Sequence, residues 1–287
     1  MNKNFCAFIL THGRPERVVT YKSLRKHGYT GKIFIIIDNE DDKEQEYRRI
    51  YGDEVIMFDK KSIAKTFDEG DNFGDRRTII YARNACFQIA EALGFEYFIQ
   101  LDDDYNRFSY RKDENREYID KSIKNLDRFF ASMLKYYKSI QALSIAMAQG
   151  GDYIGGSGSS TTRIGKPIRK CMNTFICSTK RPFQFVGRIN EDVNTYTNLG
   201  GKGELFLTIL DASIAQATTQ SNSGGMTEVY LDSGTYVKSF YTVMYSPSCT
   251  TIRLMQTTHR RLHHQISWIN AVPVILDEKY KKKTGKK

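Results

Sequence analysis

The feature that most constrains the fold is an alternation of short apolar runs and amphipathic segments over the first hundred residues. The apolar runs are rich in β-branched and aromatic residues, as buried strands are, whereas the segments between them have helical spacing. We predict strands at 5–11, 32–38, 54–59 and 95–102, and helices at 16–28, 43–52 and 75–94. This order predicts an α/β fold with a mostly parallel sheet, helices on both faces, and ligands bound beyond the carboxyl ends of the strands.

The rest of the chain predicts an elaborated, β-rich second half. We expect a long amphipathic helix at 116–140, and strands at 141–151, 174–179, 204–210 and 239–247. A Gly- and Ser-rich stretch, 150–167, is the candidate for a mobile loop or lid. No linker composition separates the halves, so we predict one domain over 1–287, with halves 1–108 and 109–276 and a basic tail at 277–287.

Composition and charge narrow the class of protein. With 40% apolar and 13% aromatic residues, the chain can bury a substantial core. Its 43 Lys and Arg against 33 Asp and Glu give a formal charge of +10, which favours a polyanionic partner such as nucleic acid or a nucleotide-bearing substrate. There is no apolar stretch of about 18 residues and no signal-peptide pattern, so we expect no membrane partner and a cytoplasmic location.

The cysteines predict neither a disulfide framework nor a zinc site. The chain has five of them, an odd number, widely scattered and without a CxxC pair. Such residues are typically reduced, buried and small-hydrophobic in role.

Three consecutive aspartates, Asp102, Asp103 and Asp104, follow the fourth predicted strand directly. Carboxylates two residues apart in a turn can bind one divalent cation, and Mg²⁺ or Mn²⁺ keeps coordination positions open for substrate phosphates. The polar segments that follow the first two strands, "THGRP" and "DNEDD", are expected at the same edge of the sheet. The alternative is a solvated acidic turn without a ligand.

These segments resemble a known family in order and spacing. "FILTHGRPERV", "IIIDNEDD" and "ARNACFQIAEALGFEYFIQLDDD" resemble the nucleotide-sugar half of GT-A glycosyltransferases, whose DxD motif binds a metal ion. More closely, the chain resembles phage-encoded TET-associated glycosyltransferases, which are inferred to add sugars to hydroxymethylated pyrimidines in DNA. The likeness extends through "MAQGGDYIGG", "GRINEDVNTYTNLG" and "QSNSGGMTEVYLDSGTYVKSFYTVMYSPSC".

The resemblance implies roles for residues of the first half, 1–108. Arg83 would face the diphosphate or the sugar, for which its permanent fork-shaped charge is suited; the alternative is a helix residue paired with a neighbouring carboxylate. Asp103 would point away or brace its loop. The remaining implied roles are nucleotide-pocket lining for Thr11 and Arg14, base or ribose binding for Asp38, nucleotide and metal binding for Asp102, and metal binding for Asp104.

Two further sites are implied in the second half. Glu191 or Asp192 would be the carboxylate beneath the acceptor hydroxyl, acting as general base if the enzyme inverts and binding acceptor if it retains. The alternative is a charge pair that favours a helix N-terminus. His263 or His264 would complete the metal shell, because GT-A enzymes often use a C-terminal histidine; a structural histidine is the alternative.

Taken together, the sequence predicts a metal-dependent glycosyltransferase that uses Mn²⁺ or Mg²⁺ and a nucleoside-diphosphate sugar donor. The expected acceptor is a hydroxyl on a hydroxymethylpyrimidine in phage DNA, with basic residues near the Gly-rich stretch contacting phosphates. These basic residues are Arg163, Lys166, Arg169 and Lys170. The alternatives are a glycan, protein or small-molecule acceptor, a nucleotidyltransferase, and a catalytically silent binding module.

Overall fold

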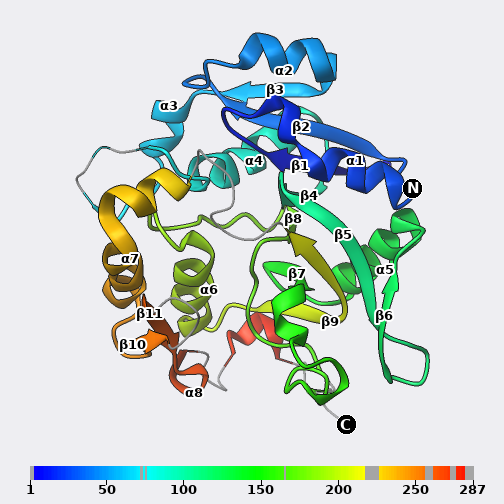
Figure 1. Ribbon diagram of the computed structural model, residues 1–287, viewed down its shortest axis with the longest axis vertical. Coiled ribbons are helices and arrows are strands. Elements are labelled where there is room, and N and C mark those ends of the chain that lie inside the picture. The colour runs from blue at the N-terminus through cyan, green and yellow to red at the C-terminus, as the bar shows by residue number, and fades with distance from the viewer. Residues whose placement is uncertain are drawn as a thin grey trace.

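The computed structural model of the protein describes residues 3–71, 74, 76–164, 166–216, 226–255, 261–271 and 276–281. Its main element is a nine-stranded sheet with helices on both faces (Figure 1). The strands are β1 (Phe5–Leu10), β2 (Lys32–Asp38), β3 (Val55–Phe58), β4 (Tyr97–Asp102), β5 (Tyr105–Lys112), β6 (Tyr118–Ser122), β7 (Ser144–Gln149), β8 (Phe175–Ser178) and β9 (Phe206–Gln216). A separate antiparallel pair is formed by β10 (Thr250–Met255) and β11 (Arg261–Ile266).

The helices account for most of the remaining described residues. The α-helices are α1 (Val19–Lys26), α2 (Glu44–Tyr51), α3 (Lys60–Ala64), α4 (Ile80–Ala92), α5 (Leu126–Ser139), α6 (Glu191–Gly201), α7 (Met226–Tyr245) and α8 (Trp268–Ala271). Short 3₁₀ turns are η1 (Pro15–Arg17), η2 (Gly52–Glu54), η3 (Gly150–Tyr153), η4 (Gly156–Gly158) and η5 (Glu278–Tyr280). Across the part of the chain that the structure describes, no helix combines the length and apolar character needed to cross a membrane.

The strand order is β3-β2-β1-β4-β8-β7-β9-β5-β6. The first four strands are mutually parallel, as the sequence predicts, and β8 then runs antiparallel to β4. Because β1 lies between β2 and β4, the loops after these three strands leave the same edge of the sheet side by side. This edge is where the predicted site residues of the first half converge.

Alternating side chains of the strands serve two cores. In β1, Phe5, Ala7 and Ile9 join one apolar cluster, whereas Cys6, Phe8 and Leu10 join the other. The first cluster is covered by α1, α2 and α5, and the second by α3, α4 and α6. All five cysteines are free and buried, as predicted.

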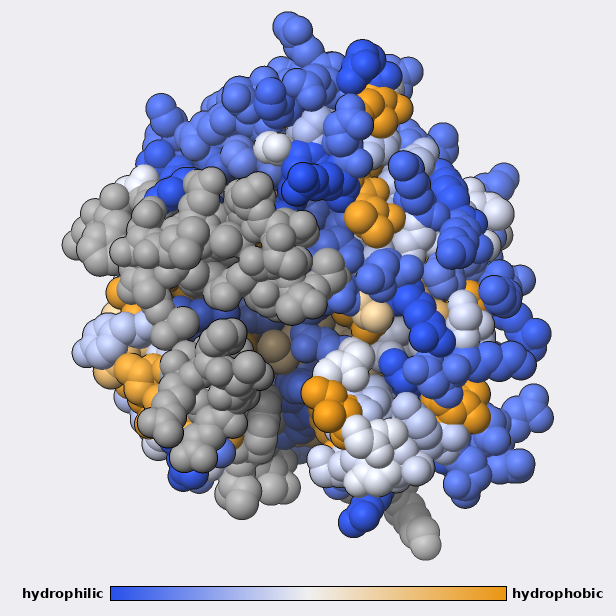
Figure 2. Space-filling view, viewed as in Figure 1, coloured by the Kyte–Doolittle hydropathy of each residue, from blue (hydrophilic) through white to orange (hydrophobic). Residues whose placement is uncertain are grey.

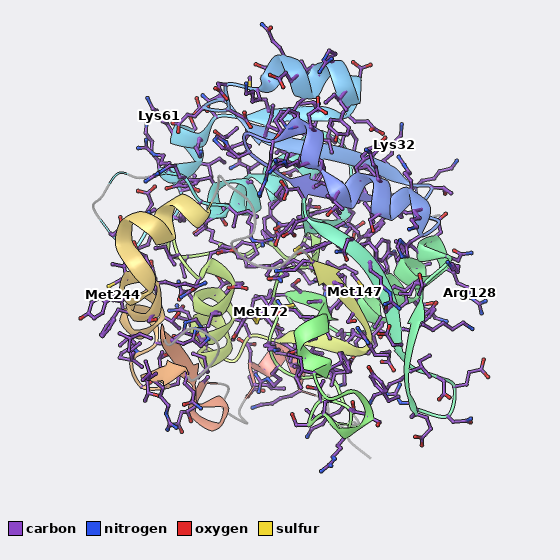
Figure 3. The ribbon with its side chains drawn as sticks, in the orientation of Figure 1. Lys32, Lys61, Arg128, Met147, Met172 and Met244 are labelled. Atoms are coloured by element: carbon purple, nitrogen blue, oxygen red, sulfur yellow. The ribbon has the colours of Figure 1, made fainter. Side chains whose placement is uncertain are left out.

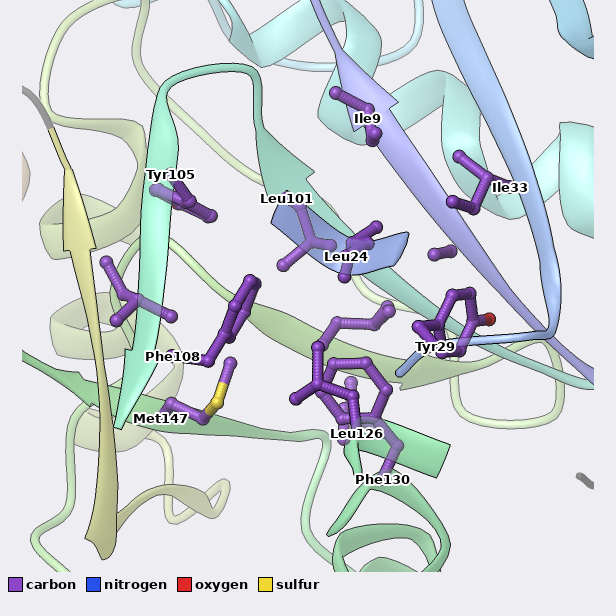
Figure 4. Close-up of a cluster of buried hydrophobic side chains, with 14 of the residues drawn as sticks. Ile9, Leu24, Tyr29, Ile33, Leu101, Tyr105, Phe108, Leu126, Phe130 and Met147 are labelled. Atoms are coloured by element: carbon purple, nitrogen blue, oxygen red, sulfur yellow. The ribbon is translucent and has the colours of Figure 1, made fainter. Parts of the chain in front are cut away.

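Figure 4 shows part of the first cluster between the sheet and α5. The Phe130 ring lies 5.5 Å from that of Tyr29 and 6.5 Å from that of Phe108, both edge-on. Leu24 from α1 and Met147 from β7 fill the same layer. This packing joins α1, α5 and strands from both halves of the chain into one core.

Most strand and helix predictions are confirmed, including the α/β class and the strands at 174–179 and 204–210. The helix predicted at 116–140 is wrong in its first part, since β6 occupies Tyr118–Ser122. Pairing explains the error: β6 forms a ladder with β5, and Asp120 bonds Arg107 and Arg111 across it. The helix begins later, where Asn125 caps α5 by accepting a hydrogen bond from the Arg128 backbone.

The strand predicted at 239–247 is also wrong, because most of this segment is the end of α7. Its β-branched and aromatic residues favour a strand locally, but tertiary packing prevails over that propensity. The exposed side chains Tyr236, Phe240 and Met244 recur every four residues, whereas Tyr241 and Thr242 are buried. This is the spacing of a helix with one face packed on the protein.

The surface is largely polar over β1, β2 and α2 (Figure 2). Lys32 at the start of β2, Lys61 on α3 and Arg128 on α5 project outwards, whereas Met147 lies inside (Figure 3). Exposed apolar side chains gather beside α7, where Met244 is 56% exposed. The α2 face is therefore largely polar, whereas the α7 side carries exposed apolar side chains.

We predict that Phe130→Ala lowers the free energy of unfolding by about 3–5 kcal/mol, because it leaves a cavity beneath α5. Phe130 is 1% exposed, whereas Tyr136 of the same helix is 36% exposed. Urea denaturation measures both, and Tyr136→Ala serves as the control with a loss below about 1 kcal/mol. Equal losses for the two variants would contradict the packing described.

Candidate active site

The acidic triplet forms a tight, braced turn. β4 ends at Asp102, and Asp103 and Asp104 turn the chain directly into β5. Thr20, in the first turn of α1, holds this turn from behind: its hydroxyl donates to the Asp102 carbonyl at 2.6 Å and accepts from the Tyr105 amide at 2.8 Å. Its own amide donates to the Asp103 carbonyl at 3.0 Å. The carboxylates are therefore presented from a fixed backbone.

Asp103 braces the loop after β1, one of the two roles expected for it. Its Oδ2 accepts from the Thr11 hydroxyl at 2.6 Å and from Arg14 Nε at 2.8 Å. Tyr47 completes the group, since its hydroxyl is 3.0 Å from both Thr11 Oγ1 and the Arg14 amide. Burial raises the pKa of Asp103, and Arg14 opposes that rise. Thr11 and Arg14 thus line this edge while tied to the acidic turn.

Arg83 links the first half of the chain to the second. Its side chain is 2% exposed, and it donates from Nη2 to Asp102 Oδ1 at 2.9 Å and from Nε to Glu191 Oε1 at 2.8 Å. The guanidinium lies 4.9 Å from the centre of the Phe175 ring. Burial alone would lower the pKa of Arg83, but Asp102 and Glu191 raise it. The acidic turn and the start of α6 therefore meet at one buried cation.

Two further carboxylates, Asp104 and Asp192, lie close in sequence to Asp102 and Glu191. Burial, together with Asp102 and Asp103, raises the pKa of Asp104 to about 7. Asp192 is half-buried at the start of α6; burial raises its pKa, and the charges of Glu191 and Asp102 add to the rise. Such rises mark acidic groups that lack enough positive charge nearby. Asp102 and Asp104 could supply the oxygen ligands that Mg²⁺ or Mn²⁺ takes.

A second polar group surrounds Asp38, at the end of β2. Its Oδ2 is 2.9 Å from His12 Nδ1, and its Oδ1 is 3.1 Å from Lys60 Nζ and 3.0 Å from the Glu40 amide. Burial would raise the pKa of Asp38, but His12 and Lys60 lower it overall. Asp41 adds to the group by accepting from the Gly13 amide at 2.8 Å.

His12 and Lys60 belong to this polar group, and the sequence prediction did not name them. Only the position of each gave a signal: His12 follows β1 within two residues, and Lys60 follows β3 within two residues. Ends of parallel strands are where ligands bind, so a polar residue there is a candidate even without a motif.

His263 and His264 lie on β11 rather than beside the aspartates. Their rings are 4.5 Å apart, and His264 Nδ1 is 3.4 Å from Asn190 Nδ2. Burial, followed by the charges of His263 and Lys238, lowers the pKa of His264 to about 4, so its imidazole is neutral. Among the residues with described placement, no three His, Cys, Asp or Glu side chains are grouped as a metal cluster. The structure thus does not bring these histidines together with Asp102 and Asp104.

Asn190 places the start of α6. It has left-handed backbone angles (φ 56°, ψ 40°), which Asn tolerates better than most residues. Its side-chain amide donates to the Lys238 carbonyl at 2.7 Å and to the Thr242 hydroxyl at 3.2 Å, both in α7. Because Glu191 follows directly, α7 helps to fix the carboxylate pair.

The Gly- and Ser-rich stretch packs on the sheet. The Tyr153 hydroxyl donates to the Leu210 carbonyl at 2.5 Å, and the ring joins a small apolar cluster with Ala148. Of the basic residues predicted here, Lys170 pairs with Asp152 at 3.2 Å, whereas Arg163 is exposed. Residue 165 and the end of the basic tail, 282–287, lie outside the described residues.

We predict that Arg83→Met destabilises the fold by about 3–5 kcal/mol, because it leaves buried carboxylates without their cation. Adding Glu191→Gln should recover part of the loss, since one of the two unpaired charges is then removed. Chemical denaturation measures each variant. The control is Arg49→Met, which breaks an exposed 3.6 Å pair with Glu16 and should cost less than about 1 kcal/mol. A single-variant loss as small as the control's would refute the bridge.

We also predict that His12 titrates above its ordinary pKa of 6.5, chiefly because it bonds Asp38. A raised pKa means that the charged form is favoured by folding, so its contribution to stability is present at acid pH and is lost as pH rises through the folded-state value. NMR titration of the imidazole measures this directly. Asp38→Asn should lower the pKa of His12, and an unchanged pKa would contradict the pairing.

Several solved structures are similar to this chain at low identity. TarS of S. aureus is 12% identical with a TM-score of 0.44, over 75% of this chain and 37% of that chain. TarS 1–349 of S. aureus in complex with UDP-GlcNAc is 12% identical with a TM-score of 0.44, over 78% of this chain and 60% of that one. The Mycobacterium tuberculosis glucosyl-3-phosphoglycerate synthase in complex with Mn²⁺, UDP and phosphoglyceric acid is 9% identical with a TM-score of 0.46, over 96% and 89%. This chain thus spans little more than a third of full-length TarS.

No curated protein sequence matches the chain significantly. A family model does: the one described as "TET-Associated Glycosyltransferase" matches residues 5–225. The match covers most of the chain and confirms the family resemblance of the sequence, and the observed sheet confirms the expected α/β fold class. The chain belongs to the TET-associated glycosyltransferase family.

Proposed function

We propose that the protein is a metal-dependent glycosyltransferase that moves a sugar from a nucleoside diphosphate to a hydroxymethylpyrimidine in phage DNA, in the cytoplasm of the host. The observation that carries the proposal is the Arg83 bridge between Asp102 and Glu191. This buried cation joins the acidic turn, where the donor would bind, to the carboxylate pair, where the acceptor would bind, in a chain of this family.

The donor would lie across the ends of β1, β2 and β4. Asp102 and Asp104 would hold a divalent ion. Burial, followed by the charges of Asp102 and Asp103, raises the pKa of Asp104, and a bound cation would offset both effects. When bound, the ion supplies positive charge that stabilises the departing diphosphate. Arg83 would orient Asp102 from behind, and Thr11 and Arg14 would border the nucleotide.

Asp192 is the better candidate than Glu191 for the catalytic base. Glu191 is bound by Arg83 at 2.8 Å and is held in the ion pair. Asp192 is half-buried, and its Oδ1 accepts only a local hydrogen bond from the Val193 amide among the described contacts, at 2.7 Å. A carboxylate in this state can take a proton from a hydroxyl within hydrogen-bond reach.

The transfer would then proceed as a displacement at the anomeric carbon. The acceptor oxygen bonds to this carbon, the bond from the carbon to the diphosphate oxygen breaks, and the acceptor proton goes to Asp192. Inversion of the anomeric centre in the product supports this role. Retention would instead leave the Glu191–Asp192 pair as an acceptor-binding group.

Two observations support DNA as the acceptor. The family is described as TET-associated, and the resemblance of the sequence implies sugar transfer to hydroxymethylated pyrimidines in DNA. The formal charge of +10 also favours a polyanionic partner. A metal-binding role for His263 or His264 stays a prediction; His264 lies beside Asn190, just before the carboxylate pair. Glycan, protein or small-molecule acceptors are the alternative to DNA.

The test is sugar transfer to DNA that carries 5-hydroxymethylcytosine or 5-hydroxymethyluracil. We predict that the purified protein, given Mn²⁺ and a panel of nucleoside-diphosphate sugars, adds one sugar to such DNA and none to unmodified DNA, as mass spectrometry of the released nucleosides would show. Asp104→Ala should reduce transfer by about two orders of magnitude or more while the circular dichroism spectrum is kept. Asp53→Ala, an exposed carboxylate on η2, is the matched control with normal transfer.

Three outcomes would count against the proposal. Transfer to a glycan or protein but not to modified DNA would overturn the acceptor. Normal transfer by Asp104→Ala, or in excess EDTA, would overturn the metal role.

A further inference from the structure

A groove lies beside the C-terminal end of α6, away from the carboxylate pair. Its volume is about 680 Å³. The charged residues that line it are Lys180, Arg181, Lys202, Lys279 and Glu204. We infer that this groove binds the phosphodiester backbone of nucleic acid and so holds a DNA substrate on the enzyme at a distance from the reaction. The inference rests on the proposed DNA acceptor and adds a second binding surface to it.

The groove lies at the edge of the sheet opposite the acidic turn. β8 runs antiparallel to β4 and places Ser178 opposite the first residue of β4, so Lys180 and Arg181 follow β8 at the edge where β4 begins. α6 ends in the same region, because it starts at Glu191 and Lys202 follows its last residue. The 11 residues of α6 span about 16 Å. The groove is therefore separate from the site where the sugar would be transferred.

The positive charge of the groove is only partly compensated. Among its described lining residues, Glu204 alone is acidic, and both of its oxygens are engaged. Lys279 Nζ lies 2.6 Å from Glu204 Oε1, and the Tyr280 hydroxyl donates to Oε2 at 2.7 Å. Lys202 is exposed and forms no ion pair with any residue that the structure describes. A ligand that enters the groove would thus meet cations in excess of carboxylates.

Arg181 adds a fixed charge to the groove. Its guanidinium lies 3.8 Å from the centre of the Tyr137 ring, and Nη1 donates to two backbone carbonyls of the segment 140–142 at 2.9 and 2.8 Å. Carbonyl partners hold the planar group without neutralising its charge. Lys180 beside it is 74% exposed, and its Nζ lies 3.4 Å from a carboxylate oxygen of Glu96. Exposed pairs of this kind are weak and leave the lysine available to another anion.

The C-terminal segment forms an ordered wall of the groove. The Asp277 amide donates to the Gly203 carbonyl at 3.2 Å, and the Leu205 amide donates to the Tyr280 hydroxyl at 3.3 Å. Gly203 has a φ of +90°, and a side chain there would meet the Asp277 amide nitrogen at 2.8 Å, so this contact requires glycine. The sequence continues from the wall as "KKKTGKK", which supplies further cations next to the groove in sequence.

The charge of the candidate active site explains why DNA phosphates would be held elsewhere. The acidic turn and the carboxylate pair contribute five carboxylates, at 102–104, 191 and 192. Such a group attracts a cation and opposes the approach of phosphates. The groove instead offers lysines, Arg181 and the side-chain amides of Gln184 and Asn198, which are donors that contact phosphate oxygens. Contacts of this kind do not read bases, so binding in the groove would be independent of DNA sequence.

The first test is the salt dependence of binding to unmodified duplex DNA, which needs neither donor nor hydroxymethyl group. The groove variant is Lys180→Gln/Lys202→Gln in the full chain. Each phosphate contact contributes about one unit to the slope of log affinity against log salt, so the slope should fall by about 2 and the affinity by about tenfold or more. Lys26→Gln/Lys121→Gln, which changes exposed lysines of α1 and β6, is the control and should keep both values. Fluorescence anisotropy measures them.

The second test uses the length of the substrate. DNA has a persistence length of about 150 bp, so a duplex of about 12 bp is a rigid rod that does not bend from one edge of the sheet to the other. Much longer DNA can occupy the groove with one stretch and the candidate active site with another, which raises the effective concentration of acceptor. At low DNA concentration, the groove variant should transfer sugar to long hydroxymethylated DNA about tenfold more slowly than the wild type, and to the short duplex at a similar rate.

The outcomes separate this inference from the proposed function. An unchanged salt slope in the groove variant, or an equal loss in the control, overturns the groove as a DNA-binding site while the proposed function stands. An equal loss of transfer on short and long DNA overturns its separation from the reaction. DNA binding that depends on the groove, in a protein that transfers no sugar to DNA, supports the groove and overturns the proposed acceptor. A melting temperature close to that of the wild type shows that the variant is folded.

Discussion

The buried guanidinium of Arg83 is the interaction on which the candidate site depends. It is bonded on one side to the carboxylate that ends β4 and on the other to the one that begins α6. Those two elements are nearly ninety residues apart in the sequence, and each alone would present an acidic group to solvent. Burying one cation between them fixes their distance, and the large cost of leaving either charge unpaired keeps the arrangement specific.

The three aspartates of the acidic turn have different neighbours. Asp102 faces the buried cation, Asp103 holds the loop after β1, and Asp104 remains the least compensated of the three. Thr20 fixes the carbonyls and amides of the turn by hydrogen bonds, so that successive side chains keep separate directions. Three neighbouring carboxylates can share one turn here because the hydrogen bonds of the backbone beneath them are satisfied.

The sequence predicted the parallel half of the fold well and the C-terminal half less well. Strands β1 to β4 are long apolar runs whose identity depends little on their neighbours, so periodicity located them. β6 and α7 depend on what they pack against: Asp120 bridges two arginines across a strand pair, and α7 buries one face of an aromatic, β-branched segment. The acidic residues could be named from motifs. The contacts of His12 and Lys60 with Asp38 could not be predicted, because only three-dimensional neighbours define them.

Asn190, with its left-handed backbone, connects the candidate site to a part of the chain beyond the family match. The match ends at residue 225, yet the carbonyl and hydroxyl that hold the Asn190 amide come from α7. α7 therefore holds the first turn of α6 in place. A sequence change in α7 could therefore shift the carboxylate pair at the start of α6 without altering the ends of β1, β2 and β4.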